Sequence, residues 1–213
     1  MIHNTAILEN VHLGKNVKIG AYSVIKDCII GDNTYIAPHV VIGEESEHST
    51  NKYELNPRES NWIIIGKDTV IREFTSINKP IKDVTMIGDE VYIMGHSYIA
   101  HDCWIEDNAV ISNGSLLGGW TRVMTYANLG LGTTCHQYTT IGSYAMIAAN
   151  ATIVKDVMPL CKYIPGKPLE INSYLVNKLK LPIHSENFQQ EEFFIKLKTE
   201  WEEKRNKDRK IYK

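Results

Sequence analysis

An aliphatic residue returns at every sixth position through the middle of the chain. The series runs without a slip from Ile87 to Ile153, and eleven of its twelve members are Ile, Leu or Val, the exception being Cys135. A period of six matches neither the 3.6-residue period of an α-helix nor the simple alternation of a strand. It predicts short strands joined by tight turns, three to a coil, with Gly, Asn or Asp where a turn needs a positive φ.

The repeat extends toward the N-terminus with two interruptions and covers roughly residues 5–157. Residues 43–62 and 78–86 break the pattern, and we expect them to leave the stack as loops. Loops on a rigid scaffold often carry function, and the first loop is the stronger candidate for a functional or subunit contact. The N-terminal members of the series are Ile7, Leu13, Ile19 and Ile25, then after one five-residue step Ile30, Ile36 and Ile42, and finally Ile65, Ile71 and Ile77.

Beyond Pro159 the pattern changes to that of helices. Residues 169–180 read as a short helix stopped by Pro182, and residues 186–208 read as a longer helix with one apolar face. We therefore divide the chain into a repeat domain, residues 1–160, and a C-terminal helical extension, residues 161–213. The apolar face of the longer helix consists of Phe193, Phe194, Leu197 and Trp201.

Composition narrows the function only by exclusion. The chain has 213 residues, 43% of them hydrophobic, and a formal net charge of −2, which excludes the broad basic surface of a nucleic-acid binder. No apolar run reaches the roughly 18 residues of a membrane span, and the first residues do not resemble a secretion leader, so we expect a cytoplasmic protein. The four cysteines form no CxxC pair and are expected to be reduced and buried.

Candidate chemistry follows from the register of the coils. Three six-residue turns make a coil of 18 residues, so positions 18 apart should lie on neighbouring coils, about 4.8 Å from each other. Adding 18 to His101 gives Gly119, and adding 18 again gives Gln137, beside His136. A histidine next to a carboxylate, here Asp102, can act as a general base. A glycine one coil away would let a substrate carbonyl approach a backbone N–H, as in an oxyanion hole.

The repeat resembles that of the hexapeptide-repeat family, whose members form left-handed parallel β-helices of triangular section. That resemblance implies an all-β fold, here with a short helical tail, and a homotrimer with active sites in the clefts between prisms. The basic end of the last helix would then pack on the trimer, with a membrane surface or carrier protein as the alternative contact.

Within that family, the chain looks like the UDP-N-acetylglucosamine 3-O-acyltransferase that begins lipid A synthesis. The motifs are IAHDC around His101, LLGG around Gly119 and the His136–Gln137 pair, in register from Ile63 to about Pro159 and including IRE at 71–73. The resemblance implies that His101 is the general base, that Asp102 polarises it and that the Gly119 amide steadies the thioester oxyanion. It also places Lys52 of the first loop on the substrate, and Asn172 at the nucleotide. The remaining expected substrate contacts are Glu73, His136 and Gln137.

The chain departs from that family at several site positions. Trp120 stands where the family has a second histidine, Asn78 and Tyr98 replace two others, and Thr50 replaces an aspartate. One cation, Lys178, remains of the arginine pair that grips the nucleotide phosphates. We expect Trp120, Asn78 and Tyr98 to line the cleft.

These departures favour the small relatives that acylate the amino or hydroxyl group of a nucleotide-linked sugar for cell-surface polysaccharide or lipopolysaccharide. Such enzymes bind no cofactor and take the acyl group from coenzyme A or acyl carrier protein as co-substrate.

Two other classes stay open on the sequence. Gamma-class carbonic anhydrases resemble the same prism and bind metal through three histidines, two of them spaced HxxxxH. His96 and His101 have this spacing, but no histidine between His48 and His96 supplies the third ligand. The other alternative is a β-helix that serves as a non-catalytic scaffold.

Overall fold

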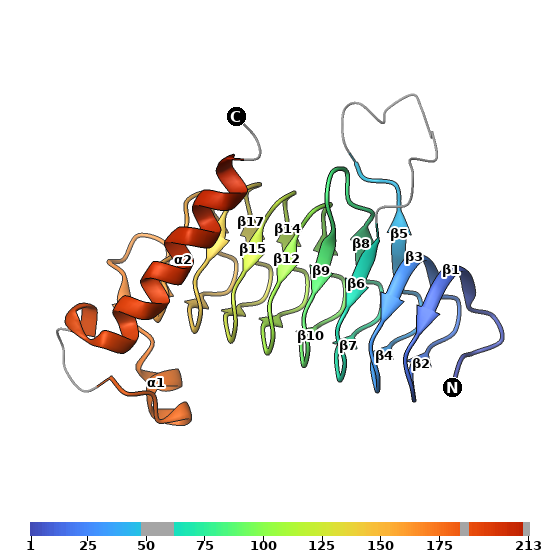
Figure 1. Ribbon diagram of the computed structural model, residues 1–213, viewed down its shortest axis with the longest axis horizontal. Coiled ribbons are helices and arrows are strands. Elements are labelled where there is room, and N and C mark those ends of the chain that lie inside the picture. The colour runs from blue at the N-terminus through green and yellow to red at the C-terminus, as the bar shows by residue number, and fades with distance from the viewer. Residues whose placement is uncertain (48–61, 184–187, 211–213) are drawn as a thin grey trace.

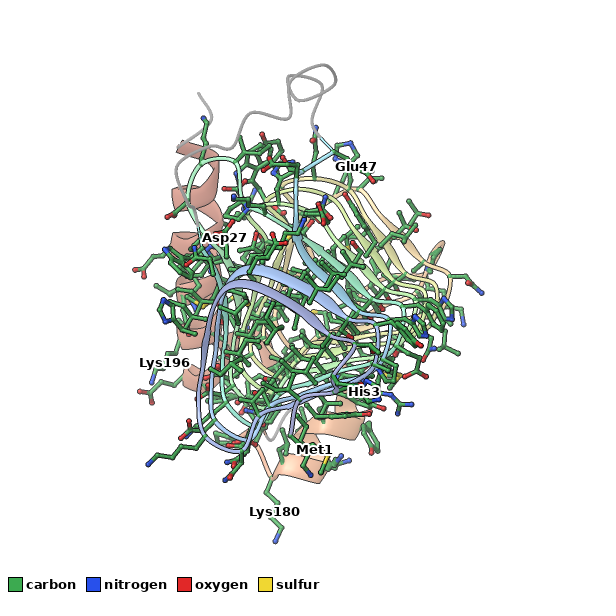
Figure 2. The ribbon with its side chains drawn as sticks, turned by 90° about the vertical axis from the view of Figure 1, so that its right-hand side faces the viewer. Met1, His3, Asp27, Glu47, Lys180 and Lys196 are labelled. Atoms are coloured by element: carbon green, nitrogen blue, oxygen red, sulfur yellow. The ribbon has the colours of Figure 1, made fainter. Side chains whose placement is uncertain are left out.

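A computed structural model gives the architecture of residues 1–47, 62–183 and 188–210. The repeat region forms a parallel β-helix, an elongated stack of coils with the N-terminus at one end and two helices near the other (Figure 1). Seen along the stack, the coils superpose into a rounded triangle, with the longer helix along one side (Figure 2). Each side of the triangle is a ladder of short parallel strands, so the prism has three faces.

The first face contains the strand that directly precedes His101 and the equivalent strands of the other coils. Its neighbours pair in parallel at a spacing of 18 residues along the regular part of the chain, as Tyr98 with Leu116 shows. Its strands are β5 (Val41–Glu44), β8 (Ser76–Asn78), β11 (Tyr98–Ile99), β14 (Leu116–Leu117), β17 (Thr134–Cys135) and β20 (Thr152–Ile153).

The other two faces complete each coil. The long strand β3 (Val24–Ile30) bends round a corner at Asp27, pairing with β5 on one side and with β6 on the other. The second face consists of β1 (Ile7–Leu13), β3, β6 (Ile63–Ile65), β9 (Thr85–Ile87), β12 (Trp104–Ile105), β15 (Arg122–Val123) and β18 (Thr140–Ile141). The third consists of β2 (Lys18–Ile19), β4 (Tyr35–Ile36), β7 (Val70–Ile71), β10 (Tyr92–Ile93), β13 (Val110–Ile111), β16 (Asn128–Leu129), β19 (Met146–Ile147), β21 (Cys161–Tyr163) and β22 (Glu170–Ile171), the last one antiparallel.

The core is the predicted series of inward residues. From Ile19 to Ile153 the aliphatic members of the series are fully or almost fully buried, and each isoleucine removed from water contributes roughly 1.5–3 kcal/mol. The series is wrong at its start. Ile7 is 52% exposed, because Leu8 rather than Ile7 pairs with the buried Ile25 of the next coil. Leu13, the next member of the series, is also 37% exposed, so the hydrophobic period is weakest in this coil.

The corners are built from single residues with positive φ. Asparagine and aspartate occupy many of these positions as expected, and Asn16, Asn33 and Asp68 form a hydrogen-bonded ladder along one corner. Aromatic residues also adopt positive φ, among them Phe74 and Trp120, which the turn chemistry did not predict. Each of the two stacks on rings of neighbouring coils, Phe74 on His39 and His96 and Trp120 on Tyr138. This stacking offsets part of the backbone cost of about 1–2 kcal/mol.

The C-terminal extension folds back on the stack. Helix α1 (Ser173–Leu179) is shorter than predicted, and α2 (Glu192–Lys210) follows a short 3-10 turn at Phe188–Gln190. Phe194, Leu197 and Trp201 of α2 are buried as predicted. Helix α2 is anchored to the prism by the ion pair from Lys204 to Glu106, at 2.8 Å. Within the residues described, no helix is long and apolar enough to cross a membrane.

Both interruptions of the repeat leave the prism from the same corner. The chain departs after β5 at Glu44 and, one coil later, after β8 at Asn78, and the second excursion returns at β9. Of the first loop, residues 48–61 lie outside the described part of the chain, and so do Lys52 and Thr50. The next coil along the stack places His101 at this corner, between β11 and β12.

Candidate active site

His101 and Asp102 form a buried pair at the corner between the first and second faces. We call this the His101 corner and define it by residues 100–103, 118–121 and 136–139 of three successive coils. The side chains of His101 and Asp102 are 8% and 2% exposed, and Nδ1 of the imidazole lies 2.9 Å from Oδ2 of the carboxylate. Asp102 has a φ of 57°, so the tight turn itself aims the carboxylate at the preceding histidine.

The second loop holds the other side of the Asp102 carboxylate. Three successive backbone N–H groups donate to it: Ile81 to Oδ2 at 2.8 Å, and Lys82 and Asp83 to Oδ1 at 3.0 and 2.9 Å. Burial raises the pKa of Asp102, but the hydrogen bonds from His101 and these amides outweigh it, so the pKa lies below the ordinary value of 3.8. The carboxylate is therefore ionised at neutral pH.

Gly119 lies directly against the imidazole. A β-carbon at this position would come within 2.5 Å of Cε1 and 2.6 Å of Nε2 of His101, closer than any real side chain approaches. A side chain at position 119 would therefore displace the imidazole, so space, and not a positive φ, favours glycine here. The carbonyl of Gly119 accepts from the amide of Tyr138, whereas its own N–H donates to no protein acceptor among the described residues.

An aromatic stack continues along the same corner. The ring of Trp120 meets His101 edge-on, with centroids 4.4 Å apart and planes at 85°. Tyr138, one coil further, stacks on Trp120 at 4.8 Å with nearly parallel planes. Trp120 thus lies beside His101, and its role in lining a substrate cleft stays a prediction. Tyr138 joins the stack, a residue that the motifs did not single out although it follows Gln137 directly.

Several of the expected substrate contacts lie close to this corner. Tyr98 starts the strand that leads to His101, and its burial, with the nearby Glu47 carboxylate, raises its pKa to about 12. His136 and Gln137 are exposed on the coil after Gly119, with Nδ1 of His136 at 3.1 Å from the Gln137 carbonyl. Asn78 is buried at the root of the second loop, where its Nδ2 donates to the Glu45 carbonyl.

Glu73 and His96 lie on a different corner of the same chain. Both precede strands of the first face, and Glu73 makes a two-point ion pair with Arg72. Next to it, four aromatic rings stack along this corner in the order Tyr22, His39, Phe74 and His96. In one chain, then, Glu73 is not brought together with His101.

Asn172 and Lys178 meet at a third place, a pocket of about 290 Å³ between helix α1 and the third face. Asn172 is fully buried and caps α1, since Oδ1 accepts from the Leu175 amide and Nδ2 donates to the Tyr144 carbonyl. Lys178 is exposed, with Nζ 5.7 Å from the centre of the Tyr174 ring. The pocket is lined further by Asn108, Val110, Tyr126, Asn128, Met146, Leu175 and Leu179.

The residues described offer no cluster of three or more histidine, cysteine or carboxylate side chains that could hold a metal ion. His96 and His101, whose spacing suggested a metal site, lie at different corners, on either side of strand β11. The four cysteines are all unpaired and buried.

Comparison with known proteins identifies the family. The model of the bacterial transferase hexapeptide (six repeats) matches residues 10–44 and 85–119. The acyl-[acyl-carrier-protein]--UDP-N-acetylglucosamine O-acyltransferase of Campylobacter concisus is 31% identical over 183 residues, covering 75% of this chain and 68% of the relative. The enzyme of that name from Helicobacter pylori is 36% identical over 135 residues, covering 62% of this chain and 48% of the relative.

The solved structure of the UDP-N-acetylglucosamine acyltransferase from Campylobacter jejuni superposes with a TM-score of 0.66 at 26% identity. The superposition covers 89% of this chain and 81% of that one. It agrees with the predicted all-β, left-handed parallel β-helix with a helical tail. With a hexapeptide repeat, a matching fold and relatives of one activity, the chain belongs to the UDP-N-acetylglucosamine O-acyltransferase family of hexapeptide-repeat acyltransferases.

Proposed function

We propose that this protein transfers an acyl group from a thioester to the amino or hydroxyl group of a nucleotide-linked sugar, for lipopolysaccharide or a related surface polysaccharide, with His101 as general base. The observation that carries the proposal is the buried His101–Asp102 pair with Gly119 in van der Waals contact. The donor is acyl carrier protein, as the relatives' names state for them, or coenzyme A.

The protonation of the pair defines which nitrogen acts. Asp102 is ionised at neutral pH and can only accept, so Nδ1 of His101 carries the hydrogen that bridges them. In the neutral imidazole the proton acceptor is then Nε2, the nitrogen on the Gly119 side. The sugar's O–H or N–H gives its proton to Nε2 while its oxygen or nitrogen attacks the thioester carbonyl. Asp102 stabilises the imidazolium that forms.

The attack places negative charge on the thioester oxygen. The Gly119 N–H is the donor proposed for it, since it makes no hydrogen bond within the described part of the chain and lies on the coil next to His101. When the tetrahedral intermediate collapses, the C–S bond breaks and the thiolate takes the proton from the imidazolium. The products are the acylated sugar and the free thiol of the carrier, with His101 neutral again.

The pocket on the third face is the proposed nucleotide site. Lys178 supplies a cation for a phosphate, and the exposed Tyr174 and the half-buried Tyr126 offer flat surfaces for a base. Asn172 would act there through the helix that it caps, because both ends of its carboxamide are already used.

A homotrimer would join this pocket to the His101 corner of a neighbouring copy. The first face supports such contact, because the outward residues of its strands are uncharged except for Glu44 at the end of β5, and those of β11 and β14 are Tyr98 and the exposed Leu116. The other such residues are Val41, Ser76, Thr134 and Thr152.

The proposal is tested by incubating purified protein with nucleotide-linked sugars that bear a free hydroxyl or amino group, in the presence of acyl-coenzyme A or acyl carrier protein thioesters of several lengths. Released thiol and product mass report transfer and locate the new ester or amide. We expect at least one sugar–donor pair to turn over in the wild type and to be lost in His101→Ala. If no pair is acylated in the wild type, the proposal fails.

A further inference from the structure

We infer that Lys79 is a positioning residue for the reaction: its ion pair with Asp27 fixes the second loop, whose amides hold Asp102 against His101. This inference rests on the proposed function only for its kinetic consequences. No motif points to Lys79, which follows β8 at the point where the repeat stops.

The side chain of Lys79 is held by a buried ion pair. Its side chain is only 9% exposed, and Nζ lies 2.7 Å from Oδ2 of Asp27 and 3.9 Å from Oε1 of Glu45. Asp27 also accepts from Nδ2 of Asn10 at 2.7 Å. Buried lysines are rare unless paired, and breaking such a pair leaves an uncompensated charge. The ammonium group is therefore held at one place, beneath the start of the loop.

Hydrogen bonds hold both ends of the second loop. At its start, the Lys79 amide donates to the Glu44 carbonyl at 2.9 Å, which ties it to the strand before the first loop. At its end, the Thr85 hydroxyl accepts from the Asp102 amide at 3.0 Å and donates to the Asn78 carbonyl at 3.2 Å. Pro80, which follows Lys79, is buried and limits the backbone further.

The second loop contacts the imidazole of His101 through the Asp102 carboxylate. Residues 81–83 present three consecutive N–H groups to one carboxylate, a geometry that holds only while the loop stays in place. The same carboxylate holds Nδ1 of His101. A connected set of contacts thus runs from Asp27 through Lys79 and the loop to Asp102 and His101, and three of its members are side chains from different coils.

Hydrogen exchange tests whether Lys79 holds the second loop in place, and it does not require enzyme activity. In Lys79→Met we expect the amides of residues 81–83 to exchange at least about tenfold faster than in the wild type, because the loop opens locally. Lys79→Arg keeps the charge and should restore most of the protection. The matched control is Lys67→Met, a lysine 57% exposed in a salt bridge to Asp89 at another corner, and it should leave this segment unchanged.

If Lys79→Met does not fold, Asp27→Asn breaks the same ion pair from the other side and is measured instead. Unchanged exchange at residues 81–83 in the folded variant overturns the inference. That result would leave the acyltransferase proposal untouched, since it concerns the loop alone.

Steady-state kinetics test whether Lys79 affects the reaction. We expect Lys79→Met to lower kcat about tenfold or more with KM for the sugar nucleotide changed less than about threefold, and Lys79→Arg to recover most of the loss. In an Asp102→Asn background the same Lys79→Met substitution should have little further effect, because it acts through Asp102. Effects that multiply in the double variant overturn the inference. Absence of transfer in the wild type instead refutes the proposed function. In that case the exchange measurement still tests whether Lys79 holds the second loop in place.

Discussion

A β-carbon on Gly119 would lie 2.5 Å from Cε1 of His101. The two residues are 18 positions apart and occupy equivalent places in successive coils, so the repeat itself brings the glycine backbone beneath the imidazole. The contact leaves Nε2 on the side of the Gly119 backbone, where a nucleophile and a thioester carbonyl can meet.

Gly119→Ala should displace the His101 ring and lower kcat by about 100-fold or more, comparable to the loss of an oxyanion donor or a general base. Gly114→Ala is the matched control: a β-carbon there meets nothing within 4 Å, but φ is +70°. The control should lose about 1 kcal/mol of unfolding free energy and keep kcat. Equal kcat losses in the two variants would contradict the close contact as the cause.

His101→Ala should reduce kcat by at least about 100-fold, because His136, the other histidine at this corner, is exposed and its Nδ1 lies against the Gln137 carbonyl and not against a buried carboxylate. The thermal midpoint should change little, because the Asp102 carboxylate keeps its three hydrogen bonds from the amides of residues 81–83. Steady-state kinetics and differential scanning calorimetry on the same preparation give both numbers. Near-normal turnover would refute the role of His101.

Asp102→Asn should change the pH dependence of stability. The folded pKa of Asp102 lies below its ordinary value of 3.8, so the stabilisation by the carboxylate is complete above that value and is lost as pH falls through the folded pKa. The difference in denaturant midpoint between wild type and Asp102→Asn should thus be largest above about pH 5 and shrink below pH 4. Glu202→Gln is the control, since its carboxylate is 48% exposed in a pair with Lys198. A difference independent of pH would contradict the prediction.

Trp120 and Tyr138 should be energetically coupled. Their rings stack at 4.8 Å, and such pairs are worth about 1 kcal/mol in double-mutant cycles with leucine measured by urea unfolding. Because Trp120 also meets His101 edge-on, Trp120→Leu should lower kcat several-fold as well. Tyr22→Leu removes a ring stacked on His39 at another corner, and it should cost stability without loss of kcat. Additive urea effects at 120 and 138 would rule out the coupling.

Lys178→Glu should weaken binding of the sugar nucleotide and lower kcat/KM by about 10- to 100-fold, the usual scale for a lost charge-assisted hydrogen bond. Lys180→Glu is the control, because Lys180 extends away from the molecule beyond the end of α1 (Figure 2). Equal losses in the two variants would argue for a long-range effect of charge and against a site at Lys178.

Mixed oligomers of His101→Ala and Lys178→Glu chains test whether the site is shared between copies. If the pocket of one copy serves the His101 corner of the next, some sites in a mixed oligomer carry both wild-type residues. Activity should then rise above that of either variant alone. If each chain forms its own site, mixing restores nothing, and light scattering shows whether a trimer exists at all.

The sequence by itself determined the parallel coils and most of the core, because a six-residue hydrophobic period is a local pattern that repeats along the chain. The same period placed Gly119 and Gln137 in register with His101, so the relative positions of these three residues were also predictable. The error at Ile7 arose in the coil where the period is weakest.

Only the tertiary structure decided what surrounds that register. The amides of residues 81–83 reach Asp102 from a loop without any period, and the Lys79–Asp27 pair joins positions 52 residues apart. The use of Asn172 as a helix cap likewise depends on how the extension folds back on the prism. Contacts of this kind depend on where irregular segments come to rest on the finished scaffold, and residue spacing carries no information about that.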